Sequence, residues 1–173
     1  RYAMFYAAVQ KNLGTPGLAL AVIRKDFLKQ AADNVPPMLS YKAQVKENSI
    51  LNTANVSGVY VSLLMLRWIK ARGIAAIEKE NTQKAQILYK AIDESKYFNA
   101  YVQDKEHRSK MNVCFTADTK ENEAAFLDLC KTNNIIGISG YRAVGGFRAS
   151  IYNAVPVENV AKLAALIQEF EAK

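Results

Sequence analysis

The sequence predicts an α/β fold, with buried sheet near the start of the chain and a small α+β domain toward its end. Two observations carry this prediction. Near the start, two short apolar runs surround a polar turn that contains glycine and proline. After residue 95 the pattern runs strand, strand, helix, strand, strand, helix. Two long stretches of helical periodicity lie between these parts.

The first two predicted strands cover residues 2–9 and 17–23, and each is a continuous apolar run. Residues 10–16 form the turn between them, and such a pair is typical of a sheet that is buried on both faces. A short helix is predicted over Asp26–Ala32, ending before a Pro-Pro pair. Residues 36–56 show little periodicity, and a segment of that length without regular structure is usually functional.

Two long helices are predicted in the middle of the chain. The first begins at Ser57 and ends at Arg72, because a basic last turn followed by Gly73 is a common helix stop. The second covers Ile74–Asp93, with apolar residues on one face and charges on the other. We therefore expect three parts: the end of a large α/β domain (1–75), a connecting helix (76–94) and a small α+β domain (95–173).

The small domain is predicted to contain four strands and two helices. The predicted strands are Tyr97–Val102, Ser109–Thr116, Ile135–Ser139 and Phe147–Tyr152. The predicted helices are Lys120–Asn133 and Pro156–Glu171. A proline in a first helical turn and an Asn-Asn pair after a helix end both fit the usual capping chemistry.

Composition excludes several classes of protein. Half of the 173 residues are apolar and 23% are charged, which is typical of a globular domain. The longest apolar run, Leu18–Ile23, is far shorter than the roughly 20 residues that a membrane helix needs. The chain begins at Arg1, without an initiating Met or a signal-peptide pattern. We therefore expect Arg1 to be a cut end, and the protein to be cytoplasmic with no membrane partner.

The charge and the cysteines point to no further site. The net charge of +7 is uneven, with +8 in residues 1–90 and −1 in residues 91–173, but the basic residues are scattered rather than interleaved with aromatics on one stripe. No nucleic-acid partner is expected. Cys114, Cys130 and His107 lack the spacing of a zinc site, so no metal is expected either. Both cysteines are expected to be reduced thiols.

Lys11 is the first candidate for chemistry. It follows an apolar strand and precedes the Gly/Pro turn. A lysine at the edge of a buried sheet would have its charged form disfavoured, which would lower its pKa and free the amine for Schiff-base chemistry. The alternative is a lysine at a strand end that covers apolar surface with its stem and keeps its charge in water.

Two further groups could bind anions. Arg142, with Tyr141 beside it, and Arg148 flank one turn, and guanidinium groups bind carboxylate and phosphate at two points. The alternative is ordinary surface arginines at strand ends. Asn52 and Thr53 precede a helix start, where amide and hydroxyl groups can bind a phosphate or simply cap the helix.

Five segments, in chain order, resemble motifs of the phosphoserine aminotransferase family. Residues 10–18 read QKNLGTPGL, similar to the family's cofactor-lysine segment QKN(I/L)GPAGL. The others are PMLSY (37–41), SILNT (49–53), RSKMNV (108–113) and GYRAVGGFRASIYNA (140–154). The last resembles the family's GHRxVGGxRASIYNA and is highly specific. The resemblance spans essentially the whole chain and implies the C-terminal part of a fold-type-I transferase that depends on pyridoxal 5'-phosphate.

The resemblance also implies a role for each candidate residue. Lys11 would form the Schiff base with the cofactor and move the proton at the substrate α-carbon. Gln10 would contact the cofactor phosphate, and Asn52 and Thr53 would hold it from the neighbouring subunit of a homodimer. Arg148 would bind the substrate α-carboxylate, and Arg142 the substrate phosphate.

The reaction implied is amino transfer between glutamate and 3-phosphohydroxypyruvate, which gives phosphoserine and 2-oxoglutarate in serine biosynthesis. A related phosphorylated four-carbon substrate would link the protein to pyridoxine biosynthesis as well, and the sequence does not decide this.

The chain departs from the family pattern in three places and in length. Tyr141 replaces the usual histidine, residues 13–16 reorder the small residues after the lysine, and Asn52-Thr53 lacks the following proline. The family has roughly twice as many residues, and the part before Arg1 would hold the cofactor's other contacts. We therefore expect little activity from these 173 residues alone. Another fold-type-I aminotransferase or lyase, or a basic non-catalytic binding module, are the alternatives.

Overall fold

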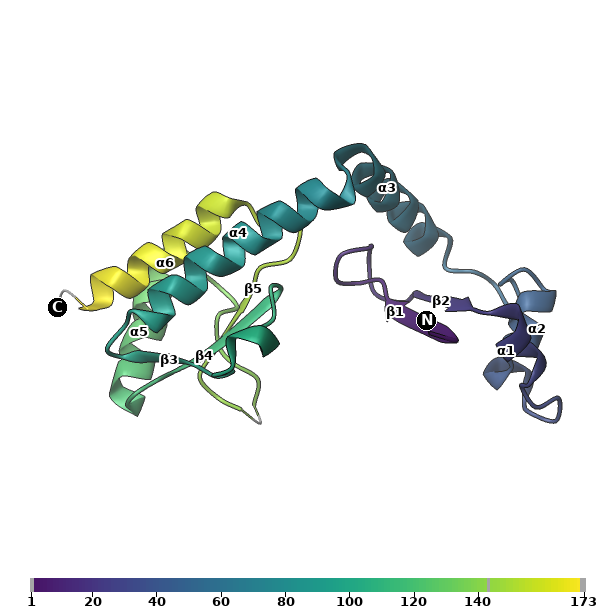
Figure 1. Ribbon diagram of the computed structural model, residues 1–173, viewed down its shortest axis with the longest axis horizontal. Coiled ribbons are helices and arrows are strands. Elements are labelled where there is room, and N and C mark those ends of the chain that lie inside the picture. The colour runs from purple at the N-terminus through teal and green to yellow at the C-terminus, as the bar shows by residue number, and fades with distance from the viewer. Residues whose placement is uncertain (1, 143, 172–173) are drawn as a thin grey trace. The chain divides into compact units, whose positions relative to one another are not determined.

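The computed structural model describes residues 2–142 and 144–171, and the chain divides into two compact units, Arg1–Ala71 and Arg72–Lys173 (Figure 1). The two units differ in how much apolar surface they bury, because almost all of the buried side chains lie in the second. No helix of the described residues combines the length and the apolar character that crossing a bilayer requires.

The first unit opens with a β-hairpin. Strand β1 (Met4–Ala8) pairs antiparallel with β2 (Ala19–Ile23), with Met4 opposite Ile23. Helix α1 (Lys25–Lys29) follows and is shorter than the predicted helix. The long helix α3 (Val56–Arg72) confirms the helix predicted from Ser57 onward.

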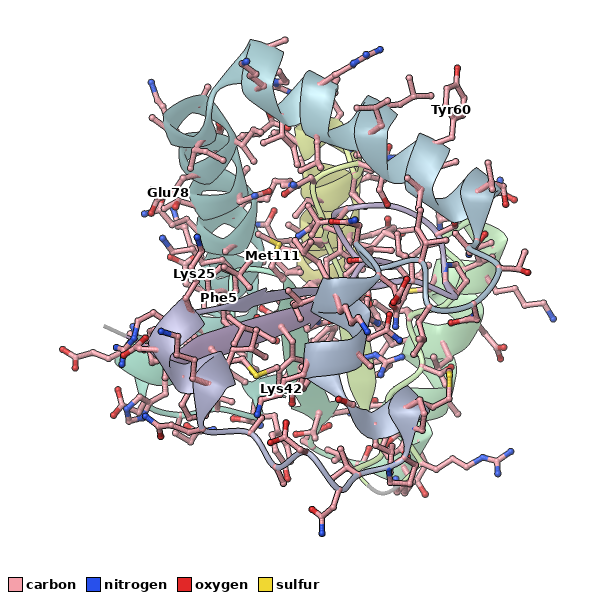
Figure 2. The ribbon with its side chains drawn as sticks, turned by 90° about the vertical axis from the view of Figure 1, so that its right-hand side faces the viewer. Phe5, Lys25, Lys42, Tyr60, Glu78 and Met111 are labelled. Carbon is pink, nitrogen blue, oxygen red and sulfur yellow. The ribbon has the colours of Figure 1, made fainter. Side chains whose placement is uncertain are left out.

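The hairpin is not buried on both faces, contrary to the prediction. No residue of β1 or β2 is buried, and Tyr6 is 76% exposed. Many apolar side chains of α3 are exposed as well, and Tyr60 projects from the helix (Figure 2). A sheet of two strands has too few neighbours to cover its apolar side chains, so the apolar runs of the sequence lie exposed here.

The segment predicted to be irregular contains two short helices. A 3₁₀ turn η1 (Pro37–Leu39) leads into α2 (Tyr41–Lys46). Ser40 caps α2, since its side-chain oxygen accepts a hydrogen bond from the Ala43 N–H at 3.2 Å. The prediction missed α2 because a helix of six residues is too short to show apolar periodicity.

The second unit is a three-stranded antiparallel sheet packed against helices. The strands are β3 (Phe98–Ala100), β4 (Asn112–Ala117) and β5 (Phe147–Ser150), in the order β3-β4-β5. The helices are α4 (Ile74–Asp93), α5 (Lys120–Thr132) and α6 (Val157–Glu171), with a 3₁₀ turn η2 (Lys105–His107) before β4. Helices α4 and α6 lie side by side (Figure 1).

One face of this sheet forms the core of the unit. Phe98, Phe115 and Phe147 each leave at most 2% of their surface exposed, and Phe126 of α5 packs 4.6 Å from Phe98 between ring centroids. Burial of each such side chain stabilises the fold by roughly 1.5–3 kcal/mol. The alternate residues point to the opposite face, which is half-buried or exposed and includes Arg148.

One expectation for this unit differs from the structure. Residues 135–139 were expected to form a strand, but Ser139 makes only an isolated bridge to Phe147. Positive φ angles at Asn134 (58°) and Gly137 (73°) break the extended backbone on both sides of Ile135.

The predicted connecting helix, residues 76–94, corresponds to α4. This helix supplies Ala85, Leu88 and Ile92 to the core of the second unit, because its apolar stripe faces α6 and the sheet. The predicted domain boundaries for the whole protein stay a prediction.

Candidate functional site

Lys11 lies on a short helical turn directly after β1. Val9 is buried, and its carbonyl accepts a hydrogen bond from the Leu13 N–H at 3.0 Å, which closes the turn around Gln10 and Lys11. Both of these side chains are exposed. Of the two interpretations of Lys11, the described residues fit the exposed lysine at a strand end, because the hairpin before it is itself exposed.

Helix α3 holds this turn through close backbone contacts. A Cβ on Gly14 would lie 2.6 Å from the Ser62 Oγ and 3.5 Å from the Ser62 backbone, so the loop lies against α3 and a larger residue would displace the Ser62 hydroxyl. The Ser62 hydroxyl is buried there, and its Oγ has no hydrogen-bond partner within the described part of the chain. The loop that carries Lys11 is thus fixed by packing within its own unit.

Asn52 and Thr53 are exposed and lie ahead of α3. Neither caps the helix, which corrects one of the two interpretations of these residues. Asn55 is the cap: its Oδ1 accepts hydrogen bonds from the Gly58 N–H at 3.0 Å and the Ser57 hydroxyl at 3.1 Å. The Asn55 amide also donates to the Gly17 carbonyl at 3.3 Å, so it links the segment of Asn52 to the loop of Lys11.

The second unit brings Tyr141, Arg142 and Arg148 onto one loop and its adjoining strand. The Arg148 N–H donates to the Ile138 carbonyl at 2.7 Å, and the Gly140 N–H donates to the Gly146 carbonyl at 2.8 Å. These two bonds join the two sides of the loop at its base, which is called the neck. Tyr141 and Arg142 lie in the loop beyond the neck, and both are exposed. Ala143 lies outside the described residues.

Arg148 is the partly protected cation of this group. It lies on the open face of the sheet, and Cys114 of β4 is directly opposite. Its Nε is buried, and no hydrogen-bond acceptor for it occurs in the described residues. A half-buried guanidinium whose Nε–H is unused is suited to a carboxylate, because one carboxylate can accept parallel hydrogen bonds from two nitrogens of the same guanidinium.

Sequence reasoning missed a buried polar pair on α4. Asn81 and Lys84 are both buried, with 3% and 0% exposure. They lie on the same helical stripe as Ile77 and Leu88, at spacings of three and four residues. That periodicity was the signal that could have placed them inside, against the usual preference of lysine for solvent.

The cysteines and acidic residues add no metal site. Cys114 and Cys130 are free thiols. Within residues 2–142 and 144–171, no three His, Cys, Asp or Glu side chains gather in a way that could hold a metal ion.

Comparison with known proteins identifies the family. The model of the class-V aminotransferases matches residues 2–163. The chain belongs to this family. The family and the fold class predicted from the sequence motifs are thereby confirmed, and the solved structures below share the fold.

Among related aminotransferases, a phosphoserine aminotransferase of Bacillus cereus is 42% identical over 99% of this chain and 48% of its own length. A solved phosphoserine aminotransferase structure that records radiation damage of its Schiff base matches 99% of the chain and 48% of its own, with 40% identity and a TM-score of 0.94. A phosphoserine aminotransferase from Trichomonas vaginalis with bound PLP matches 96% and 48%, with 33% identity and a TM-score of 0.89. The chain spans about half the length of the curated relatives it matches.

Proposed function

We propose that the protein containing this chain is a pyridoxal 5'-phosphate-dependent phosphoserine aminotransferase. It transfers an amino group between glutamate and 3-phosphohydroxypyruvate, giving phosphoserine and 2-oxoglutarate. The observation that carries the proposal is Lys11 on an exposed turn, inside a chain that is about 42% identical from end to end to phosphoserine aminotransferases.

The residues of the first unit fit the cofactor by their chemistry. An aldehyde needs a primary amine, which Lys11 presents on a turn fixed against α3. A phosphate needs hydrogen-bond donors, and Gln10, Asn52 and Thr53 are exposed amide and hydroxyl groups. Asn52 and Thr53 would serve the site of the partner subunit in a homodimer. When bound, the cofactor supplies the electron sink for carbanion chemistry.

Lys11 would act as the base and acid at the substrate α-carbon. Its amine accepts the proton from that carbon and returns a proton to the carbon that receives the amino group. The exposed turn leaves room for substrate to reach this amine, and the contacts of Gly14 and Asn55 hold the turn in place.

The arginines would select the substrate. Arg148 would bind the α-carboxylate, since its buried Nε is an unused donor. Arg142 and the Tyr141 hydroxyl, both exposed beyond the neck, would bind the phosphate. The +7 charge of the chain favours anionic substrates and cofactor in the same way.

The test is borohydride reduction of the full-length protein with pyridoxal phosphate, followed by peptide mapping. We expect the label on Lys11, and a label on any other lysine would refute the assignment. In steady-state assays, Arg142→Ala is expected to lose activity on phosphorylated substrates only. A uniform loss would favour another aminotransferase or lyase of the same fold.

The proposal also covers where the enzyme acts in the cell and whether these 173 residues are active alone. We propose a cytoplasmic enzyme of serine biosynthesis, and a role in pyridoxine biosynthesis through the related four-carbon substrate stays an open prediction. These 173 residues alone are expected to be inactive, because the relatives use about twice this length. Turnover by the purified 173-residue chain would overturn that expectation.

A further inference from the structure

Lys84 is a buried cation that the proposed reaction leaves without a role. Its side chain, on α4, is completely buried. Glu80, one turn earlier on the same helix, forms its ion pair with the Arg72 guanidinium instead. Burying a lysine is costly unless its donors are satisfied, so its position here needs a reason.

The three donors of the Lys84 ammonium all meet backbone carbonyls. Its Nζ lies 3.1 Å from the Ile151 oxygen, 2.8 Å from the Tyr152 oxygen and 3.1 Å from the Val155 oxygen. A lysine ammonium has three N–H groups, so its hydrogen-bonding capacity is used entirely on one stretch of five residues. This stretch, residues 151–155, is called the exit segment of β5.

Other polar side chains hold the same exit segment. The Asn81 amide, three residues before Lys84 on α4, donates to the Asn153 side-chain oxygen at 2.8 Å. From the opposite side, the Asn112 amide of β4 donates to the Tyr152 hydroxyl at 2.9 Å. One backbone bond, from the Ile151 N–H to the Met111 carbonyl at 2.9 Å, holds the first residue of the exit segment as well. Side chains of α4 and β4 and this one backbone bond therefore fix the exit segment together.

The exit segment begins directly after the strand that carries Arg148. Strand β5 has only four residues and lies at the edge of the sheet, with β4 as its neighbour in the ladder. Its entry is tied by the bond from the Arg148 N–H to the Ile138 carbonyl. Its exit is held by Lys84, whose ammonium donates to the carbonyl of Ile151, the third residue after Arg148.

We propose that Lys84 is a positioning residue for Arg148: by holding the carbonyls of the exit segment, it fixes the end of β5 and so the place of the guanidinium that receives the substrate carboxylate. This rests on the proposed function of Arg148. Without the ammonium, the Ile151 and Val155 carbonyls lose the donor from Lys84, and the Tyr152 carbonyl keeps only its bond from the Val155 N–H at 3.0 Å. The exit segment then moves to satisfy these oxygens.

The test compares Lys84→Met with Lys90→Met in the full-length enzyme. Lys90 lies on the same helix but its side chain is 72% exposed, so its variant is the matched control. For Lys84→Met, KM for the amino acid substrates is expected to rise about tenfold, with kcat changed less than about twofold. Amide exchange over Phe147–Ser150 is expected to quicken in this variant and not in the control.

The outcomes separate this inference from the proposed function. If Lys84→Met only lowers the melting temperature, with KM and the exchange of β5 unchanged, the inference is overturned. Arg148→Ala tests the proposed function by itself, since an unchanged KM there refutes carboxylate binding by Arg148. Added to Arg148→Ala, Lys84→Met is expected to raise KM no further, and a further rise overturns the inference.

A milder variant covers the case in which Lys84→Met does not fold. Asn81→Ala removes the neighbouring bond to the exit segment and leaves the Lys84 contacts intact. We expect a smaller rise in KM and faster exchange over the same strand. No change in either quantity overturns the inference.

Discussion

Gly140 controls the loop that carries the proposed phosphate-binding residues, and replacing it tests that arrangement. A Cβ at this position would lie 1.9 Å from the Gly145 carbonyl oxygen and 2.7 Å from its carbon. Both are backbone atoms, so no side-chain rotation relieves the overlap. The Gly140→Ala variant can fold only if the two sides of the neck move apart.

The size of this movement sets the expected effect. Separating the two sides to an ordinary contact needs about 1.5 Å. A displacement of only about 1 Å in an enzyme site already costs roughly 100-fold in rate. We therefore expect kcat/KM for phosphoserine to fall about 100-fold, equivalent to about 2.7 kcal/mol of transition-state stabilisation. The bond between the Gly140 N–H and the Gly146 carbonyl would weaken at the same time.

The matched control lies in the same loop. Gly145 has φ +74° and nothing within 4 Å of an added Cβ, so its restriction is conformational and not steric. Asparagine tolerates this backbone region better than other side chains, and Gly145→Asn is expected to retain most of the activity. Steady-state kinetics with phosphoserine, alongside thermal melting, make the comparison. Equal kcat/KM values for the two variants would refute the steric argument.

Three further predictions concern the second unit. Burial raises the pKa of the Cys130 thiol to about 11, so the unfolded chain loses this proton first as pH rises past about 9. The free energy of unfolding is expected to fall across that window by at most roughly 2.7 kcal/mol in urea titrations, and the same slope in Cys130→Ala would contradict this cause. Hydrogen bonds from Arg108 lower the pKa of the Asp93 carboxyl, so the stability from this pair is present above pH 3.8 and is lost as pH falls through the native pKa. Arg108→Met is expected to flatten the acid limb of the stability curve, and an unchanged limb would exclude the pair as its source. Phe126→Ala is expected to lower the free energy of unfolding by about 3–5 kcal/mol in urea, whereas Phe5→Ala, at an exposed position, changes it far less. Equal losses would contradict the location of the core.

The sequence predicted the helices well because their signals are local. Helix α4 has its predicted bounds, since Gly73 with φ +81° precedes it and its apolar stripe repeats over five turns. The strand expected at residues 135–139 failed for a local reason too, because the positive φ at Asn134 is not obligatory for asparagine and so is not visible in the sequence.

The candidate site was predictable only where residue identity sufficed. Motifs single out Lys11, Arg142 and Arg148, and their roles stay predictions. The exposure of Lys11 depends on what covers the hairpin, which no local pattern describes. Asn55 and Lys84 were missed because their partners, Gly17 and the exit segment, are distant in sequence. Such long-range pairs follow from topology rather than from composition.

The concentration of the core in the second unit has a consequence for how the chain responds to heat or denaturant. Arg72–Lys173 encloses a continuous apolar cluster, whereas Val9 is the main buried apolar side chain of Arg1–Ala71 among the described residues. For these 173 residues taken alone, the two units are therefore expected to open at different free energies, so a single melting temperature would not describe their unfolding. Part of the binding energy for any ligand at Lys11 is consequently spent on restricting the local opening of the first unit. The affinity of these residues alone for such a ligand is then expected to be lower than the contacts by themselves would give.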